Sequence, residues 1–425
     1  MVSKILPNVS VFALAGGDGN RLQPLTDFRA KPAVPFGGKW IIFDLVLWSL
    51  YYSGLRDVGV LVQRNAVSLA DHLASAWPRR PDGGSYFRVL PPEGFNDPIK
   101  GMVREYQGTA NAVYQHLQSV HRRDDVLIVA GDHLYKADFS HFWEFHKGLN
   151  ADLTVMATSV PVEEAKRYGV MVTEPDCNVT AFCEKPQAPC EIPGKPGLSY
   201  CSMGVYLFKR EVLEAYLTKD AYNENSSHDF GRDIIPAMIA DGLLVYAFPF
   251  SENVAPGQRE PYWRDVGTID AYWQAHMDLC SDDPHLNLFT ESWPVGTVHD
   301  SAPPLKIGGG DSIISNTQMS GFCIITQSVV RYSVFGRRIN VTDSLIEQSI
   351  LFDQLTVEPG CVLQKVIVDV DPRYEIYRRA VIPTGTKIGV DRELDLSRGF
   401  TITESGVTVV PSTWFEKNSF FIDVL

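Results

Sequence analysis

The sequence lacks any apolar run of about 20 residues, the length that a membrane-spanning helix needs. It also lacks an excess of positive charge, because 38 Lys and Arg stand against 51 Asp and Glu, for a formal net charge of −13. A surface of this charge disfavours nonspecific binding to nucleic acid, which needs basic side chains that replace counterions at phosphates. We therefore expect neither a membrane nor a nucleic acid as a partner.

Cysteines are few, and no two of them form a C-x-x-C pair. The seven positions are Cys177, Cys183, Cys190, Cys201, Cys280, Cys323 and Cys361. An odd number without paired spacing predicts neither a disulfide framework nor a zinc knuckle. A metal site among the first four stays open as the less favoured alternative to free thiols. Because the N-terminal segment also lacks the pattern of a cleaved signal peptide, we expect a mature cytoplasmic protein.

A length of 425 residues predicts two domains, and the sequence changes character near residue 296. Before that point, short apolar runs alternate with stretches of helical spacing such as 68–77 and 108–121. The runs are VFALA (11–15), VGVLV (58–62), VLIVA (126–130), LTVMA (153–157) and MGVYLF (203–208). This alternation predicts an α/β domain over 1–296, with a mostly parallel sheet that binds ligands at the carboxyl ends of its strands.

Helical patterns become rare after residue 296, and apolar residues recur six positions apart. These residues are Ile339, Leu345, Leu351, Val357 and Leu363. A period of six with Gly and Pro between predicts a parallel β-helix, and a meander of short strands stays open as the alternative. We expect the linker in the Pro- and Gly-rich stretch 292–312 and assign 297–425 to the second domain.

A glycine-rich loop follows the first apolar run, in the segment VFALAGGDGNRLQ. Such a loop lets backbone N–H groups approach phosphate oxygens, although GGDG has the spacing neither of a dinucleotide fingerprint nor of a Walker loop. Arg21, Arg29 and Lys31 follow within a few residues, and three cations would offset much of the charge of a triphosphate. The segment therefore predicts a site for the phosphates of a nucleotide.

Two acidic residues are candidates for a metal site. Asp132 follows the run VLIVA, where carboxylates commonly hold Mg²⁺ on a nucleotide, and the N-cap of a helix is its ordinary alternative. Asp265 has Tyr262 and Trp263 beside it, which also fits plain core packing. Lys185, in CEKP, is on local sequence an ordinary surface lysine. The residues alone thus lead to a nucleotide-binding α/β enzyme with a β-helical second domain.

The sequence resembles the bacterial and plant glucose-1-phosphate adenylyltransferases over almost its full length. The matching segments, in the family's order, are LAGGDGNRLQPLT, RAKPAVPFGGK, QGTANAV, AGDHLYKADF, YGVMV, EKP, SMGVYLF, NSSHDFGRDIIP and PYWRDVGTIDAYWQA. The resemblance implies a Rossmann-like catalytic domain followed by a left-handed parallel β-helix. It implies the conversion of ATP and glucose 1-phosphate to ADP-glucose and pyrophosphate for glycogen or starch synthesis. It also implies a homotetramer, or a tetramer with a paralogous subunit.

The resemblance assigns roles residue by residue. Arg21 and Lys31 would neutralise the leaving pyrophosphate, Asp132 and Asp265 would hold Mg²⁺, and Lys185 would clamp the phosphate of glucose 1-phosphate. The residues that would bind the nucleotide are Ala15, Gly16, Gly17, Gly19, Gln63, Gly108 and Thr109. Those that would line the glucose 1-phosphate pocket are Glu184, Lys185, Ser202, Tyr206, Asp229, Phe230 and Trp263.

The sequence departs from the family where metabolite effectors bind through Lys and Arg side chains. Phe28, Ile41 and Ile402 stand where basic residues are usual, and Arg29 is retained. Apolar replacements remove most of the Coulombic attraction for an anion, so we expect weakened or altered allosteric control. Two alternatives stay open, a noncatalytic regulatory subunit and the same chemistry with another nucleoside triphosphate or sugar 1-phosphate.

Overall fold

The computed structural model describes residues 6, 8–17, 19–77, 86–93, 105–298, 301–374 and 378–423. One nine-stranded sheet forms the centre of the chain up to residue 298, which we call the sheet part. Its strands are β1 (Val9–Leu14), β4 (Val58–Leu61), β5 (Phe87–Leu90), β6 (Asp125–Ala130), β8 (Leu153–Pro161), β9 (Gly169–Thr173), β10 (Val179–Glu184), β11 (Leu198–Lys209) and β12 (Val245–Pro249). The five apolar runs of the sequence correspond to β1, β4, β6, β8 and β11, as predicted.

The strand order of this sheet is β10-β9-β11-β6-β1-β4-β5, with β8 beside β11 and β12 beside β8. β6, β1, β4 and β5 are parallel to one another, whereas β11 runs antiparallel to β6. The carboxyl ends of β1 and β6 therefore lie next to each other. The glycine loop follows β1 and Asp132 follows β6, so both lie at the same edge of the sheet, as a parallel arrangement requires.

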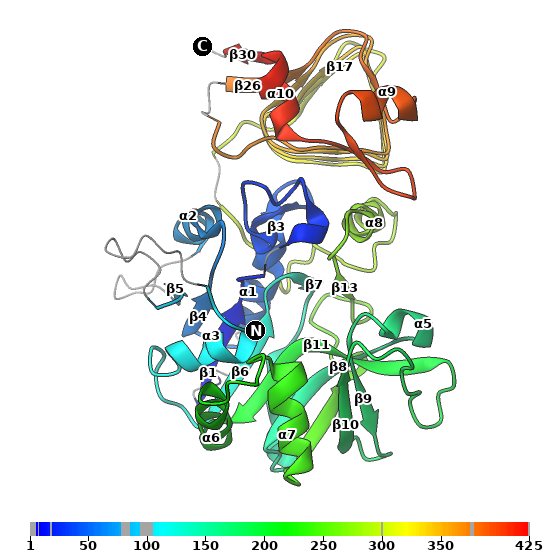
Figure 1. Ribbon diagram of the computed structural model, residues 1–425. Coiled ribbons are helices and arrows are strands. Elements are labelled where there is room, and N and C mark those ends of the chain that lie inside the picture. The colour runs from blue at the N-terminus through cyan, green and yellow to red at the C-terminus, as the bar shows by residue number, and fades with distance from the viewer. Residues whose placement is uncertain are drawn as a thin grey trace.

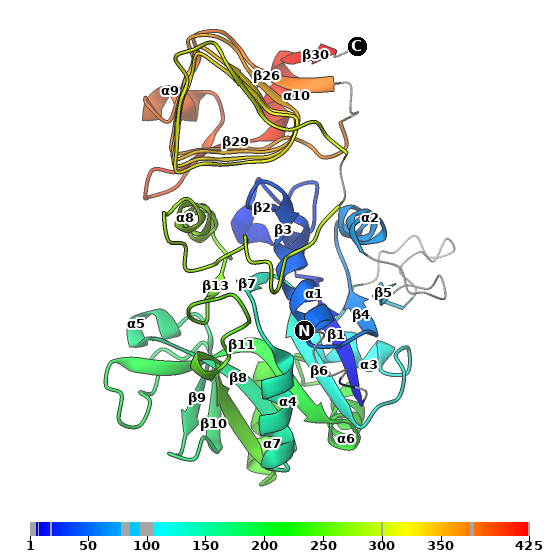
Figure 2. The same cartoon turned by 180° about the vertical axis from the view of Figure 1, so that it is seen from behind.

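Helices cover both faces of the sheet. Successive residues of β1 point to opposite faces, and apolar side chains on both faces need to be buried. Val11 and Ala13 share one buried cluster and Phe12 another, and all three are fully buried. The helices on the first side include α1 (Ile42–Tyr52), α2 (Ala66–Ala76) and α4 (Phe139–Gly148). Those on the second side include α3 (Thr109–His116), α6 (Arg210–Ala221) and α7 (Ile235–Ala240). Figures 1 and 2 show the two layers from opposite sides.

From residue 306 the chain forms a left-handed parallel β-helix with three sheets. The first contains β14 (Lys306–Gly308), β17 (Ile324–Thr326), β20 (Asn340–Thr342), β23 (Leu355–Val357), β26 (Arg378–Ile382) and β30 (Phe421–Asp423). The second contains β15 (Ile313–Ser315), β18 (Val329–Arg331), β21 (Leu345–Glu347), β24 (Val362–Gln364) and β27 (Lys387–Ile388). The third contains β16 (Gln318–Met319), β19 (Val334–Phe335), β22 (Ile350–Leu351), β25 (Val366–Val368), β29 (Thr408–Val410) and β28 (Thr401–Ile402). The prediction of a β-helix is confirmed.

The coils do not repeat with a strict period of six. The amide of Ser344 donates to Oγ of Ser328, 16 positions earlier, and the amide of Cys361 donates to Oγ of Ser344, 17 positions earlier. Three segments of six residues each would make a longer coil than this. The buried apolar positions therefore do not stay six residues apart along the chain. Leu345, which the six-residue spacing places inside, is partly exposed, while Ile346 is fully buried. The spacing argument was therefore wrong for Leu345.

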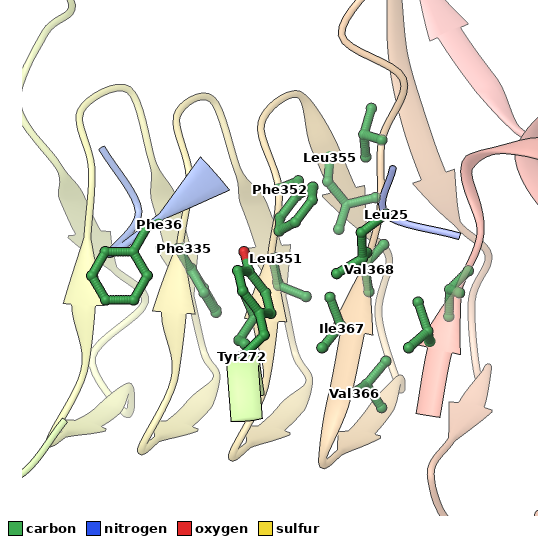
Figure 3. Packing of buried hydrophobic residues seen from close by; sticks show 14 of the residues in the cluster. Leu25, Phe36, Tyr272, Phe335, Leu351, Phe352, Leu355, Val366, Ile367 and Val368 are labelled. Atoms are coloured by element: carbon green, nitrogen blue, oxygen red, sulfur yellow. The ribbon is translucent and has the colours of Figure 1, made fainter. Parts of the chain in front are cut away.

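A hydrophobic cluster connects the sheet part to the β-helix. Leu25, Phe36 and Tyr272 of the sheet part lie against Phe335, Leu351 and their neighbours on the β-helix (Figure 3). Each of these side chains is fully buried, which contributes roughly 1.5–3 kcal/mol per side chain. The segment that follows the glycine loop is thus packed against the β-helix. Among the described residues, none of the helices has the length and apolar character needed to cross a bilayer.

Candidate active site

A cavity of about 420 Å³ opens at the carboxyl ends of β1 and β6. Six of the residues expected to bind a nucleotide line it: Ala15, Gly16, Gly17, Gln63, Gly108 and Thr109. Gly19 does not line the cavity. Its φ of +64° lies in the left-handed region, and a Cβ there would stand 3.0 Å from Cγ2 of Thr26, so Gly19 serves the turn itself.

Gly108 lets α3 approach the loop that precedes η3 (Phe230–Ile234). A Cβ on Gly108 would stand 2.3 Å from the carbonyl oxygen of His228, to which the amide of Ala110 donates. Thr109 Oγ1 donates to Oδ2 of Asp229 at 3.0 Å and accepts from the amide of Phe230 at 3.2 Å. These contacts connect the end of the cavity that contains the residues expected to bind a nucleotide to its other end.

The other end contains four of the residues expected at the glucose pocket: Glu184, Tyr206, Asp229 and Phe230. Oδ1 of Asp229 caps η3 by accepting from the amides of Gly231 and Arg232, so this carboxylate also has a structural role. Burial raises the pKa of Tyr206, which keeps its hydroxyl protonated as a hydrogen-bond donor or acceptor.

Three further residues expected there do not line the cavity. Ser202 is buried, and its Oγ donates to the hydroxyl of Tyr206, which does line the cavity, at 3.4 Å. The Lys185 side chain is 57% exposed and its Nζ lies 3.1 Å from Oε1 of Glu184. Trp263 packs against the ring of His133, with ring centroids 5.4 Å apart. Lys185 therefore reaches the rim of the pocket rather than its interior.

Asp132 and Asp265 come together because their short strands pair. Asp132 precedes β7 (His133–Tyr135), and β13 (Trp263–Asp265) runs antiparallel to β7 with Asp265 opposite His133. The helix N-cap alternative for Asp132 is wrong, since α4 begins at Phe139 and its N-cap is Asp138. Nζ of Lys31 lies 2.8 Å from Oδ2 of Asp132 and 3.2 Å from Oδ1 of Asp265.

These charges determine the protonation of the site. Burial alone would lower the pKa of Lys31, but the carboxylates of Asp132 and Asp265 raise it above its ordinary value. Burial alone would raise the pKa of Asp132, but Lys31 and His133 hold it well below its usual range. The lysine is thus positive and Asp132 is ionised throughout the neutral range.

The carboxylates of Asp132 and Asp265 are suited to hold a hard divalent cation. One oxygen of each carboxylate contacts Nζ of Lys31, and each carboxylate has a second oxygen of the kind that Mg²⁺ prefers as a ligand. Within the part of the chain that the structure describes, no group of three or more His, Cys, Asp or Glu side chains has metal-binding geometry. The remaining ligands of a cation here would be water or phosphate oxygens, and the alternative of a cysteine metal site is not supported.

The two arginines near the glycine loop have different positions. The side chain of Arg21, in η1 (Asn20–Leu22), is 67% exposed and does not line the cavity, and its Nη2 lies 4.0 Å from Oδ2 of Asp265. The expectation that Arg29 also faces the phosphates is wrong. Arg29 is only 3% exposed and lies against the β-helix, where its Nη1 is 2.6 Å from Oδ1 of Asp369. Closeness in sequence did not reveal that the segment turns between the two residues.

Two residues with polar side chains at the site were not predicted from the sequence. Tyr106 lines the cavity, and its amide donates to Oε1 of Gln63 at 3.3 Å. Nε2 of His133 lies 3.6 Å from Oδ1 of Asp132 and 3.7 Å from Oδ1 of Asp265. The sequence signal for each was its position in or beside a matching segment, since His133 lies within AGDHLYKADF and Tyr106 directly precedes QGTANAV. The pairing of β7 with β13, which places His133 between the carboxylates, is a tertiary feature.

Comparison with known families agrees with this architecture. Residues 11–282 match the family model of nucleotidyl transferases, and residues 306–410 match the GlmU-like C-terminal hexapeptide. Fold, site and matches together define a nucleotidyltransferase with a hexapeptide β-helix. Members of this class generally use a divalent metal ion.

Three full-length relatives specify the family. The glucose-1-phosphate adenylyltransferase of Deinococcus radiodurans is 41% identical over 414 residues, covering 95% of this chain and 98% of the relative. That of Thermus thermophilus is 42% identical over 408 residues, covering 94% and 96%. Glucose-1-phosphate adenylyltransferase 2 of Vibrio cholerae is 40% identical over 409 residues, covering 94% and 97%. The chain belongs to the glucose-1-phosphate adenylyltransferase family.

Proposed function

We propose that this protein transfers the adenylyl group of ATP to glucose 1-phosphate, forming ADP-glucose and pyrophosphate. The observation that carries the proposal is the arrangement of Lys31, Asp132 and Asp265 beside one cavity, whose two ends contain the residues matched to the nucleotide and to the sugar. Family membership over almost the full chain supports the same substrates.

The reaction needs charge neutralisation and alignment more than acid–base chemistry. A phosphate oxygen of glucose 1-phosphate forms a bond to the α-phosphorus of ATP, and the bond from that phosphorus to the oxygen of the β-phosphate breaks. Pyrophosphate carries away the electron pair, so neither a covalent enzyme intermediate nor a proton transfer is required. Holding two anions in line in a preorganised positive site is the principal contribution of the protein.

Each group of residues has a defined task in this proposal. The backbone of Gly16 and Gly17 lets phosphate oxygens approach closely, while Lys31 and Arg21 neutralise the β- and γ-phosphates. Lys185 would meet the sugar phosphate at the rim, with Glu184 orienting its ammonium. We further propose that Asp132 and Asp265 hold Mg²⁺, which when bound supplies positive charge that offsets the phosphates.

The assembly and its surroundings are proposed from the resemblance. We propose a homotetramer, or a tetramer with a paralogous subunit, in the cytoplasm, with ADP-glucose used for a glycogen-type glucan. The division into domains 1–296 and 297–425 is likewise a proposal, supported by the prolines and glycines of the connecting stretch. Sedimentation of the purified chain would test the assembly.

Steady-state assays on the purified full-length chain test the function. With ATP, glucose 1-phosphate and Mg²⁺ we expect ADP-glucose, and with ADP-glucose and pyrophosphate we expect ATP. A panel of UTP, dTTP and GTP, and of other sugar 1-phosphates, tests whether the chemistry serves another substrate. Absence of turnover in both directions would favour the noncatalytic regulatory subunit.

We also propose that control by anionic metabolites is weakened or altered. The ring of Phe28 lies beneath the guanidinium of Arg373, at 4.2 Å from its Cζ, and Ile41 is buried. Arg29, the retained cation, is paired with Asp369, and Arg373 is paired with Asp371. An anion would therefore find little free positive charge at these positions.

A further inference from the structure

Arg29 connects the segment after the glycine loop to the β-helix by several directed contacts. Its Nη1 is 2.6 Å from Oδ1 of Asp369 and donates to the carbonyl oxygen of Leu25 at 3.0 Å. Its Nη2 donates to the carbonyl oxygen of Val370 at 2.7 Å. The guanidinium thus binds the sheet part through Leu25 and the β-helix through Asp369 and Val370.

The ion pair of Arg29 and Asp369 is shielded from water, so moving the two charges apart is costly and their relative position is fixed. The side chain of Arg29 is 3% exposed and that of Asp369 is 1% exposed. Neither charge is screened by solvent at this depth, and separating them would leave a buried charge uncompensated. The packing of Leu25 against the β-helix buries apolar area, but this stabilisation depends little on the relative orientation of the two parts (Figure 3). The ion pair therefore specifies the orientation that the packing alone does not.

Only one residue separates Arg29 from Lys31. The amide of Ala33 donates to the carbonyl oxygen of Ala30, and the amide of Val34 donates to that of Lys31, which makes a tight turn of this segment. A displacement of Arg29 is thus transmitted to Lys31 through a short, hydrogen-bonded backbone. Lys31 in turn contacts both carboxylates of the site, at 2.8 and 3.2 Å.

We infer that Arg29 and Asp369 are positioning residues, through which the β-helix holds Lys31 in its place for phosphate neutralisation. This inference rests on the proposed adenylyl transfer for its catalytic consequence. Neither residue touches the cavity, so both act through the backbone of the segment. The β-helix is then part of the catalytic machinery in addition to any role in assembly.

A double substitution separates positioning from simple charge compensation. Asp369→Leu alone leaves the Arg29 charge buried, whereas Arg29→Met with Asp369→Leu removes both charges and keeps the volume apolar. We expect the double variant to recover most of the melting temperature lost in Asp369→Leu, while its kcat stays at least about tenfold below the parent. KM for glucose 1-phosphate should change by less than about twofold, because the sugar end is built from other elements. A parental kcat in the double variant would overturn the inference.

A second measurement needs no turnover. Asp369→Asn keeps the shape of the side chain and loses its charge, and we expect faster amide hydrogen exchange in peptides that cover residues 19–34. The control is Ser405→Ala, which removes the hydrogen bond from Ser405 Oγ to Oδ1 of Asp270, a contact between the same two parts at 2.7 Å through α8 (Ile269–Leu279). This control should leave kcat and the exchange unchanged.

The two measurements separate the two proposals. If the parent protein makes no ADP-glucose, the proposed function fails, and the exchange experiment still tests the coupling of Arg29 to Lys31. If the exchange over residues 19–34 is the same in Asp369→Asn and in the parent, the coupling itself is refuted.

Discussion

Nζ of Lys31 and Oδ2 of Asp132 lie 2.8 Å apart, although 101 positions separate the two residues in the chain. The site therefore depends on a carboxylate that is held ionised by a neighbouring cation. Asp132→Asn removes that charge with almost no change of volume. We expect kcat to fall about 100-fold or more, since preorganised charge is directed at the transition state, with KM for glucose 1-phosphate nearly unchanged.

The control for this substitution is Asp138→Asn in the same part of the chain. Asp138 is the N-cap of α4, where its side chain accepts from the amide of Ser140. Asparagine caps a helix about as well as aspartate, so stability and kcat should both stay near the parent values. Titration of activity with Mg²⁺ and with Mn²⁺ completes the measurement. An Asp132→Asn enzyme with parental kcat would remove Asp132 from the proposed metal site.

Lys185→Ala tests the proposed contact with the sugar phosphate. The side chain lies at the rim, so its loss removes a charge contact to the substrate without opening the core. We expect KM for glucose 1-phosphate to rise about tenfold or more, while kcat falls much less. Lys195→Ala, at an exposed position away from the cavity, is the matched control. KM and kcat are measured from initial rates over a range of glucose 1-phosphate concentrations. An unchanged KM in Lys185→Ala would refute the assignment.

Gly108→Ala tests the close approach of α3 to the loop before η3. The added Cβ would stand 2.3 Å from the carbonyl oxygen of His228, so the backbone must shift by a large part of an ångström. We expect KM for ATP to rise about tenfold and the melting temperature to fall by several degrees. Gly148→Ala is the control, because a Cβ there meets nothing within 4 Å and alanine favours a helix. Equal effects of the two substitutions would contradict the steric argument.

The strands around the site were predictable because their apolar runs are buried on both faces. Val11, Phe12 and Ala13 are all buried and apolar, so the strand reads as a continuous apolar run, and the glycines that follow mark its end. The β-helix was also predictable, but its phase was not. Coils of 16 and 17 residues depend on how each corner is built, so the inward position passes from Leu345 to Ile346.

The direction of single side chains was the part that sequence could not determine. Arg29 and Lys31 are almost adjacent, yet one contacts the β-helix and the other the carboxylates. Their partners, Asp369 and Asp132, lie far away in the chain, and a local pattern contains no information on such distant pairing. His133 was overlooked for the same reason, since its position depends on the register of β7 with β13.

The proposed weakening or alteration of control by anionic metabolites predicts a weak response to them. We expect fructose 1,6-bisphosphate, fructose 6-phosphate, pyruvate, AMP and phosphate each to change the rate by less than about twofold, because little Coulombic attraction remains at Phe28, Ile41 and Ile402. The assay uses the purified chain at half-saturating ATP and glucose 1-phosphate. Strong activation by any phosphorylated sugar would contradict the charge argument.

His276 predicts how stability depends on pH. Its ring is bound in the neutral form, since Nε2 accepts from the amide of Gly37 at 3.2 Å and Nδ1 donates to the carbonyl oxygen of Tyr272 at 3.0 Å. Burial lowers the pKa of His276 to about 4. The unfolded chain therefore binds the extra proton first, and stability falls as the pH drops from about 6.5 toward 4, by up to about 3 kcal/mol. The measurement is the free energy of unfolding at pH 7.5 and at pH 5. Between these two pH values His276→Gln should lose less stability than the parent or than His121→Gln, the control at an exposed site. An equal loss would exclude His276 as the group that titrates.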